Sequence, residues 1–446
     1  MLPGCRFISG TSSKPLLKTL ALSAVIFLTV SGGPYGLEPL MHYAGKNGSL
    51  LLLCLVPLLW DVPTILAVLE LNSMMPAEGG YYKWVRRGMG ERWAFYEGWW
   101  SWLYSFADMA IYPALAVTYI SYFFPYLTEF RVPVCLTVVW VCALLNITGI
   151  LNVGRISLTI GVIILIPFFI LFYMAFTSGA LNIAIPSPNL NGIGYSSLGM
   201  GIYTVMWNFI GWDNVTTYAG EVNRPVRSYL VSICISFALA FAVYFVTVLI
   251  TINSGIDFLK LNDFGFPLLS EKIGGPFLGA LTATGGLAMA YGVFSAVMLS
   301  ISRVPAAMAT DNLMPHFLCK LHPRFNTPYL AIIICAAAVS CLVVFSLPEL
   351  IVIDVLLYGA GLFLEFIALL ALRIKEPDAP RPFKIPLNTM MLTVMVSAPA
   401  IVFMFALYGI IANSGGHYAM FLVAFAALLS AEAVWLAIKR IRTSSR

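Results

Sequence analysis

Carboxylic acids inside apolar stretches are the residues of this chain that could do chemistry. Placing a charge deep in a membrane span costs at least about 2.5–3.5 kcal/mol, so such groups are functional by default. With no lysine or arginine at comparable depth, each acid must be protonated, reach water or meet an imported cation. The pattern therefore indicates a cationic substrate, a coupling proton, or both. The deep acids are Asp61, Glu70, Asp108, Asp213, Asp354 and Glu365, with Glu38 just beyond an interruption.

Asp108 and Asp213 have the strongest claim to a functional role. Asp108 lies near the middle of an aromatic-rich span that begins at about residue 94. Asp213 lies inside an interrupted span, and Trp207 comes one turn before it, so that both can border one cavity. A tryptophan face attracts a cation by about 0.5–2 kcal/mol. We therefore predict a cationic group held by these acids and covered by Trp207.

The other candidates have structural alternatives. Glu365 could form an ion pair with Arg373 two turns later, or could lie near mid-membrane and carry a proton. Three acids could lie near span ends and be solvated, namely Asp61, Glu70 and Asp354. Most aromatic residues in membranes pack or anchor at the interface, so the remaining aromatic candidates are weaker than Trp207: Tyr104, Tyr112, Trp212, Tyr291 and Phe294.

Two apolar stretches are interrupted at corresponding places, residues 24–38 and 203–214. In the first, Gly32, Gly33 and Gly36 permit positive φ and close approach of a ligand, and Pro34 blocks helix continuation. Backbone groups left unpaired in a membrane survive only where protein or a cavity surrounds them. Their N–H groups suit a carboxylate and their carbonyls suit an ammonium group. Paired interruptions in two halves of a chain point to the binding site of a transporter.

The composition indicates that this chain spans a membrane. The chain is 60% hydrophobic and 10% charged, with a mean hydropathy of +0.90, whereas soluble domains carry about 25% charge. Its 446 residues leave room for about twelve spans of roughly 20 residues. No cleavable signal peptide is evident. The predicted spans are 17–44, 49–74, 94–124, 132–150, 155–179, 198–221, 228–253, 276–310, 328–347, 349–373, 389–413 and 417–438.

The basic residues predict the orientation. All but four of the 25 Lys and Arg fall on one side of these spans, and the four exceptions are Lys46, Arg131, Lys260 and Lys272. By the positive-inside rule both termini are then cytoplasmic, in a multi-pass protein of the plasma membrane or of a bacterial inner membrane. The net charge of +5 reflects these loops and does not indicate nucleic-acid binding.

The first ten spans divide into five plus five within a single transmembrane domain. An odd number of spans per half gives the second half the opposite orientation, which is an inverted repeat. The first repeat is 17–179 and the inverted second repeat is 198–373. Two extra helices, 389–438, lie outside the repeats and could contact lipid or form a homodimer.

Five sequence motifs carry a family resemblance. They are SGGPYGLE at 31–38, PAEGGYY at 76–82, FIGWD at 209–213, the stretch 302–315, and LEFIA at 364–368 with RPFKIP at 381–386. Together they resemble the amino acid–polyamine–organocation superfamily, in its plant-type polyamine and cationic amino acid uptake branch. The resemblance covers about residues 20–390.

The resemblance implies an all-α, LeuT-type fold with twelve transmembrane helices, of which helices 1 and 6 are broken. Helices 1, 2, 6 and 7 would move against helices 3, 4, 8 and 9. By similarity, Ser31, Gly32 and Gly33 bind the polar end of the substrate, and Asp108 and Glu38 align with acids of the polyamine branch. The predicted substrate-binding set is Ser31, Gly32, Gly33, Tyr35, Glu38, Tyr104, Asp108, Trp207, Asp213 and Tyr291. The proton-coupling candidates are Asp108, Asp213 and Glu365.

One departure from the family concerns coupling. Some proton-coupled relatives carry a lysine in helix 5, but residues 160–172 contain no acidic or basic side chain. Coupling would then use a carboxylate, a counter-substrate, or a sodium ion held by carbonyls and by hydroxyls such as those of Ser295 and Ser300.

These observations predict a secondary active transporter of amines, with polyamines or cationic amino acids as substrates, working by alternating access. It needs no cofactor or metal beyond a coupling H⁺ or Na⁺. A neutral amino acid permease whose acids carry protons is the first alternative, and a substrate sensor that has lost transport is the second. An enzyme is not expected, because no His/Cys metal cluster and no nucleophile–base pair is apparent.

Overall fold

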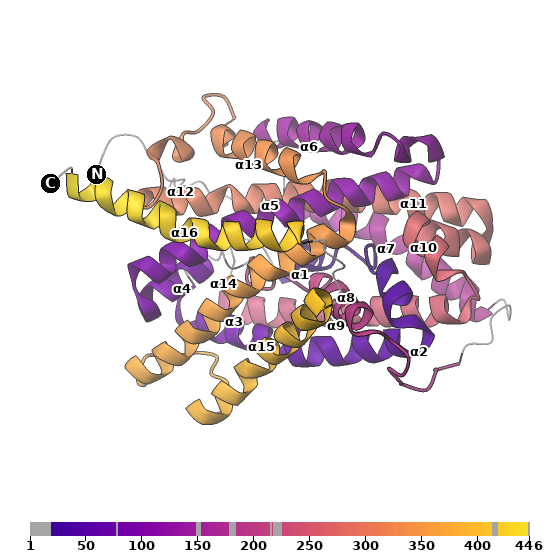
Figure 1. The fold of residues 1–446 in the computed structure, drawn as a ribbon, viewed down its shortest axis with the longest axis horizontal. Helices are drawn as coiled ribbons and strands as arrows, with labels where there is room; N and C mark the ends of the chain where they lie inside the picture. The colour runs from indigo at the N-terminus through magenta and orange to yellow at the C-terminus, as the bar shows by residue number, and fades with distance from the viewer. Residues whose placement is uncertain are drawn as a thin grey trace.

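The computed structural model describes residues 19–76, 79–148, 153–177, 184–214, 216, 225–325, 327–412 and 418–444, and within them it is helical without a strand (Figure 1). The all-α prediction is confirmed. The first half contains α1 (Thr19–Val30), α2 (Glu38–Val56), η1 (Pro57–Asp61), α3 (Val62–Met74), α4 (Gly80–Met89), α5 (Glu91–Ser121), η2 (Pro125–Thr128), α6 (Arg131–Ile147) and α7 (Val153–Thr177). The second half contains α8 (Tyr195–Trp207), α9 (Pro225–Asn253), α10 (Phe258–Phe264), α11 (Phe266–Ile301), α12 (Arg303–Thr310), η4 (His316–Cys319), α13 (Tyr329–Leu342), α14 (Leu347–Lys375), α15 (Thr389–Ala412) and α16 (Ala419–Ser444).

Eight helical stretches of the described residues are long and apolar enough to cross a membrane. Eight of the twelve predicted spans coincide with them, and three more coincide with the shorter apolar helices α1, α6 and α13. The remaining predicted span, 198–221, begins in α8, which is described only to Trp207 as helix. The last part of this predicted span, residues 217–221, lies outside the described residues.

The first interruption is formed by the glycines that the sequence singled out. Helix α1 ends at Val30 and α2 begins at Glu38. Between them Gly32, Gly33 and Gly36 adopt φ values of 60°, 89° and 87°, which cost other residues strain but suit glycine. In the second interruption the chain leaves helix after Trp207 and turns through residues 208–214, with Gly211 at φ 103°.

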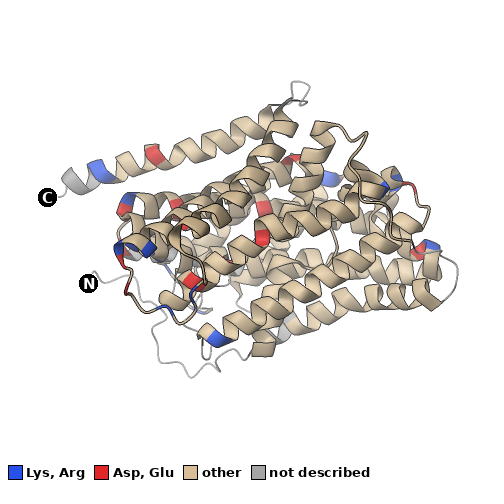
Figure 2. Cartoon of the chain, turned by 90° about the horizontal axis from the view of Figure 1, so that it is seen from below, with Lys and Arg blue, Asp and Glu red and all other residues tan. Residues whose placement is uncertain are grey.

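Helices α5 and α14 pack against each other and carry four of the eight buried acids of the described residues. Figure 1 places α4 and α12 at one end of the long axis and α10 at the opposite end. Figure 2 shows Lys and Arg gathered toward the ends of the bundle, while acidic positions also occur along the middle of the helices. In the part of the chain that the structure describes, α5 and α14 therefore bring four acids into the interior, and Arg373 of α14 is the one buried base on these two helices.

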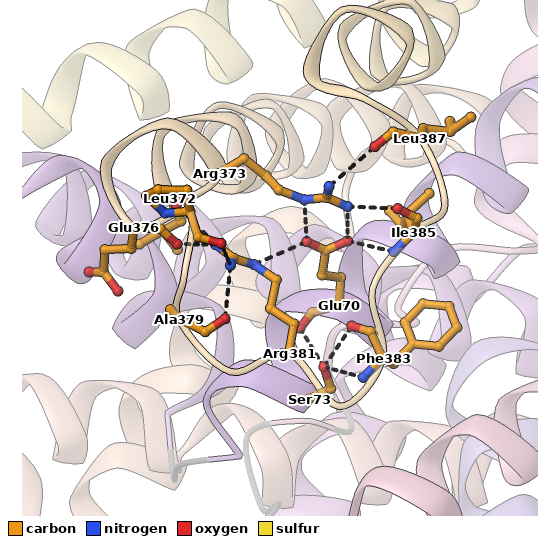
Figure 3. A network of polar contacts seen from close by, with 11 residues as sticks. Glu70, Ser73, Leu372, Arg373, Glu376, Ala379, Arg381, Phe383, Ile385 and Leu387 are labelled. Atoms are coloured by element: carbon orange, nitrogen blue, oxygen red, sulfur yellow. Dashed lines mark hydrogen bonds and ion pairs between the residues drawn. The ribbon is translucent and has the colours of Figure 1, made fainter.

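A buried ion-pair network fastens one end of the bundle (Figure 3). Glu70 of α3 lies between Arg373 of α14 and Arg381 of the segment after α14, with N···O distances of 2.5 and 3.3 Å. The backbone N–H of Ile385 also donates to Glu70, at 2.9 Å. Because only 1% of the Glu70 side chain is exposed, the prediction that it could be a solvated span-end residue is wrong.

The predicted pair between Glu365 and Arg373 is also wrong, because Arg373 binds Glu70 instead. Eight residues of α-helix advance about 12 Å along the axis, which separates Glu365 widely from Arg373. The carboxylate of Glu70, on another helix, lies closer to Arg373. Glu365 is left among other acids, as described below.

A second ionic cluster lies at the α4 end. Asp311, just after α12, accepts hydrogen bonds from Tyr82, Lys83 and Arg86, at 2.9, 2.8 and 2.6 Å. Burial alone would raise the pKa of the Asp311 carboxyl, but the hydrogen bonds from Lys83 and Tyr82 and the charges of Lys83 and Arg86 outweigh it and hold the pKa below its usual value.

This contact should weaken in acid. A carboxyl whose pKa is lowered by folding stabilises the protein above its unfolded pKa, about 3.9, and loses that contribution as the pH falls through the folded value. The partners are partly exposed, so we expect a stabilisation of about 0–1 kcal/mol. Thermal unfolding of the purified protein between pH 7 and pH 3 would measure it. In Asp311→Asn this acid-dependent loss should disappear, and an unchanged acid profile in the variant would contradict the assignment.

Candidate functional site

A cavity lies where the two interruptions meet α5 and α11. The residues that line it are Thr29, Val30, Ser31, Tyr35, Asp108, Tyr112, Trp207, Asn208, Ile210, Asn214, Met289 and Val293. Its interior has room for about one water molecule. A ligand larger than water therefore requires the wall to move, and Trp207 and the glycine-rich turn form part of that wall.

Asp108 is the charged group of this cavity. It is the one acid among the lining residues, and none of the lining residues is Lys, Arg or His. Its Oδ1 accepts a hydrogen bond from the Tyr112 hydroxyl at 2.7 Å and a longer one from the Trp207 indole N–H at 3.4 Å. No donor in the described part of the chain contacts Oδ2. The carboxylate is thus oriented through Oδ1 alone.

Trp207 covers the cavity because Gly36 lets it approach. A Cβ at Gly36 would lie 2.5 Å from Cζ3 of Trp207, at a backbone φ of 87°. Gly32 is similarly tight, since its Cβ would lie 3.0 Å from Cγ of Met289 in α11. The turn therefore packs against Trp207 on one side and against α11 on the other.

Gly36→Ala should lower the rate of uptake about tenfold, because Trp207 must move and the backbone strain adds about 1–3 kcal/mol. Gly45→Ala is the matched control, since Gly45 has a similar φ of 62° but nothing within 4 Å of the added Cβ. Transport and thermal stability are measured on both purified variants. Both carry the backbone strain of a positive φ, so a loss found only in Gly36→Ala comes from the contact with Trp207. Equal losses in the two variants would show that contact with Trp207 is unimportant.

Tyr244 of α9 joins the two interruptions. Its hydroxyl lies 2.7 Å from Ser31 Oγ and 3.1 Å from the carbonyl oxygen of Asn208. The Asn208 side-chain amide in turn donates to the carbonyl of Gly36, at 3.3 Å. Movement of either turn is thereby coupled to the other. Neither Tyr244 nor Asn208 is a candidate on sequence grounds, because neither stands out in an apolar span.

Glu38 lies outside the cavity lining, although it was predicted to bind substrate. Its carboxylate accepts hydrogen bonds from the N–H of Gly36, the hydroxyl of Tyr119 and the N–H of Phe266, at 2.6, 3.1 and 3.2 Å. These donors come from the first interruption, α5 and the start of α11. Glu38 thus ties the glycine-rich turn to the α10–α11 junction and positions the site without contacting its interior.

Asp213 and Tyr104 adjoin the cavity without lining it. Asp213 Oδ1 accepts a hydrogen bond from Tyr358 of α14 at 2.9 Å. Tyr104 donates to the side chain of Asn214 at 2.6 Å, and Asn214 lines the cavity instead of Asp213.

Tyr291 is also absent from the lining, which contains Met289 and Val293 of the same helix. Residues four apart share a helical face, whereas the residue between them points elsewhere. Tyr291 is near Cys142 of α6. The structure thus brings Ser31, Tyr35, Asp108 and Trp207 of the predicted set to the cavity, with Gly32 and Gly33 in the turn beside them.

The sequence matches the family model described as amino acid permease over residues 17–430. The chain belongs to the amino acid permease family. This permease is therefore a multi-pass membrane transporter and not an enzyme, as predicted, and the superfamily resemblance is confirmed.

Plant proteins are among its curated relatives. A probable polyamine transporter of Arabidopsis thaliana is 31% identical over 388 residues, which cover 86% of this chain and 77% of the relative. A polyamine transporter of Oryza sativa subsp. japonica is 31% identical over 394 residues, covering 87% and 73%. An uncharacterized transporter of Mycobacterium tuberculosis is 27% identical over 307 residues, 67% of either chain.

Proposed function

We propose that this permease is a secondary active transporter of amines, with linear polyamines and cationic amino acids as its favoured substrates. The observation that carries the proposal is Asp108, a buried carboxylate on the cavity wall that accepts hydrogen bonds from Tyr112 and Trp207. An ammonium group would compensate this charge and contact the aromatic rings at the same time. The names of the plant relatives support the same substrate class.

We infer alternating access around this cavity in a LeuT-type arrangement. Repeats 17–179 and 198–373 would carry the interruptions as helices 1 and 6 of twelve. Helices α15 and α16 would lie outside the repeats. Their exposed apolar side chains, such as Met390, Ile401 and Leu429, suit lipid or a second copy of the chain. Both termini would lie in the cytoplasm, in keeping with the distribution of Lys and Arg.

Coupling in this proposal uses protons or a counter-substrate. Asp108, Asp213 and Glu365 are the candidate proton carriers, because each is buried and at most 7% exposed. A carboxyl that meets a cation in one state and lacks one in another is expected to exchange a proton between them. The alternative is coupling to a sodium ion held by carbonyl and hydroxyl oxygens.

Competition in proteoliposomes tests the substrate class. Putrescine, spermidine, spermine and arginine should compete for uptake at two pH values, with and without sodium, and leucine and serine should not. Dependence on pH with no effect of sodium would support protons, and dependence on internal amine would support exchange. If leucine or serine enters and the amines neither enter nor compete, the protein is a neutral amino acid permease and the proposal is wrong. Binding without flux would identify a sensor.

A further inference from the structure

Acids recur along α5 and α14 at the same interval. Asp108 of α5 is an electrostatic neighbour of Asp354 of α14. Eleven residues nearer the α4 end of each helix lie Glu97 and Glu365. Eleven residues are about three turns, so both acids of a helix share one face and lie roughly 16 Å apart along its axis. Two levels of carboxyl groups therefore face each other across the interface of these helices.

The level nearer α4 forms a second acidic cluster, Glu97, Asp213 and Glu365. Asp213 interacts electrostatically with both glutamates, and Glu97 with Glu365. All three are at most 2% exposed. Ser101 donates to Glu97 Oε1 at 3.0 Å, but Glu97 Oε2 and Glu365 Oε2 make no hydrogen bond to any of the described residues. The electrostatic partners described for these glutamates include no lysine or arginine.

The hydroxyl of Tyr81 supplies an independent indication of a ligand. Tyr81 comes from α4 and is 1% exposed, and no residue that the structure describes makes a hydrogen bond to its hydroxyl. It interacts electrostatically with all three acids of the cluster, and the nearby Ser101 uses its hydroxyl hydrogen on Glu97. A buried hydroxyl without a partner costs about 1–3 kcal/mol, and a polar group entering the cluster would remove that cost.

The two levels are connected by aromatic side chains. Tyr104 interacts electrostatically with both Asp108 and Asp213. Its ring makes an edge contact with the ring of Tyr358, at 5.3 Å between centroids, and Tyr358 donates to Asp213. Aromatic faces between two acidic levels suit a chain that alternates hydrocarbon segments with ammonium groups.

We propose that the second acidic cluster is a subsite for the distal ammonium of a linear polyamine with at least three amines. The proximal ammonium would lie at Asp108 and the hydrocarbon segments along Tyr104 and Tyr358. A metal ion does not fit, because in the described part of the chain no three His, Cys, Asp or Glu side chains are placed to hold one. A two-amine substrate is too short to use both levels. The proposal rests on the proposed function, since it assumes an amine at Asp108.

Glu97→Gln tests the subsite, because it removes the charge and keeps the size and the acceptor for Ser101. Losing one charge-assisted hydrogen bond should raise the KM for spermidine and spermine about tenfold or more. The KM for putrescine should stay within about twofold of the wild-type value, because putrescine occupies only Asp108. Tyr81→Phe should show the same selectivity with a smaller change, and it covers the case in which Glu97→Gln fails to fold. Asp61→Asn, a buried acid outside both levels that accepts from Trp212, controls for the loss of any buried charge.

Three outcomes overturn the subsite. Equal KM changes for putrescine and spermine, a change confined to the pH dependence of uptake, or no change in any KM would show a proton carrier or a structural acid. If wild-type protein transports spermine and putrescine while the selectivity is missing, only the subsite fails. If wild-type protein transports no amine, the proposed function fails as well.

Discussion

Asp108→Asn is expected to raise the KM for putrescine, spermidine and arginine about 30-fold or more. Removing one partner of a buried charge pair costs about 2–5 kcal/mol, and each 1.4 kcal/mol is a factor of ten in affinity. Asparagine keeps the size of the side chain and an oxygen that can accept from Tyr112 and Trp207, so both aromatic side chains should stay in place. Uptake of labelled amine into proteoliposomes, with thermal stability measured on the same preparation, gives the comparison.

Asp61→Asn serves as the control for this experiment, because Asp61 is equally buried but accepts from Trp212 and does not line the cavity. Its KM values should remain near those of the wild type. An opposite pattern would be decisive: if Asp108→Asn leaves amine affinity intact and abolishes only the pH dependence, Asp108 carries a proton and does not bind the cation.

The first interruption could be predicted because its cause is local. Glycine at positive φ and proline without an N–H act within a few residues, and Gly32, Gly33 and Gly36 all adopt positive φ. Asp108 was likewise accessible to sequence reasoning, since a charge at mid-span has few structural explanations. Helix α8 ends at Trp207, within the stretch 203–214 for which the sequence predicts an interruption.

The contacts between distant helices could not be predicted. Tyr244 and Ser31 are 213 residues apart, and a single tyrosine in an apolar helix resembles any packing residue. The face of α11 that points into the cavity could not be predicted either. This helix is apolar on all sides, so its sequence marks no preferred face. As a result Tyr291 was chosen in place of Met289 and Val293. Glu38 was assigned by resemblance, and its three donors became visible only when α5 and α11 were in place.

The predicted ion pair between Glu365 and Arg373 was wrong for a related reason, namely a partner that is distant in sequence. Glu365 and Arg373 are neighbours along one helix, so sequence reasoning paired them, whereas Glu70 lies about 300 positions from Arg373. The pairing of Arg373 with Glu70 changes the role assigned to both Glu70 and Glu365. Glu70 becomes a structural residue, and Glu365 is left without a base in the second acidic cluster.

Glu70→Gln should destabilise the folded protein by about 3–5 kcal/mol, because it removes the buried carboxylate that the buried guanidinium groups of Arg373 and Arg381 share. Their side chains are 6% and 2% exposed, so water cannot replace the carboxylate. The midpoint of thermal or denaturant unfolding in detergent measures the change.

Glu432→Gln is the matched control, since Glu432 pairs with Arg92 at 2.8 Å where both side chains are at least 40% exposed. That pair should contribute at most about 1 kcal/mol. A Glu70→Gln variant as stable as Glu432→Gln would mean that the carbonyl oxygens of Leu372, Ile385 and Leu387, which also accept from the two arginines, are sufficient to hold them. The segment after α14 would then be fastened by its backbone and not by the ion pair, and the buried position of Glu70 would need a role in transport to explain it.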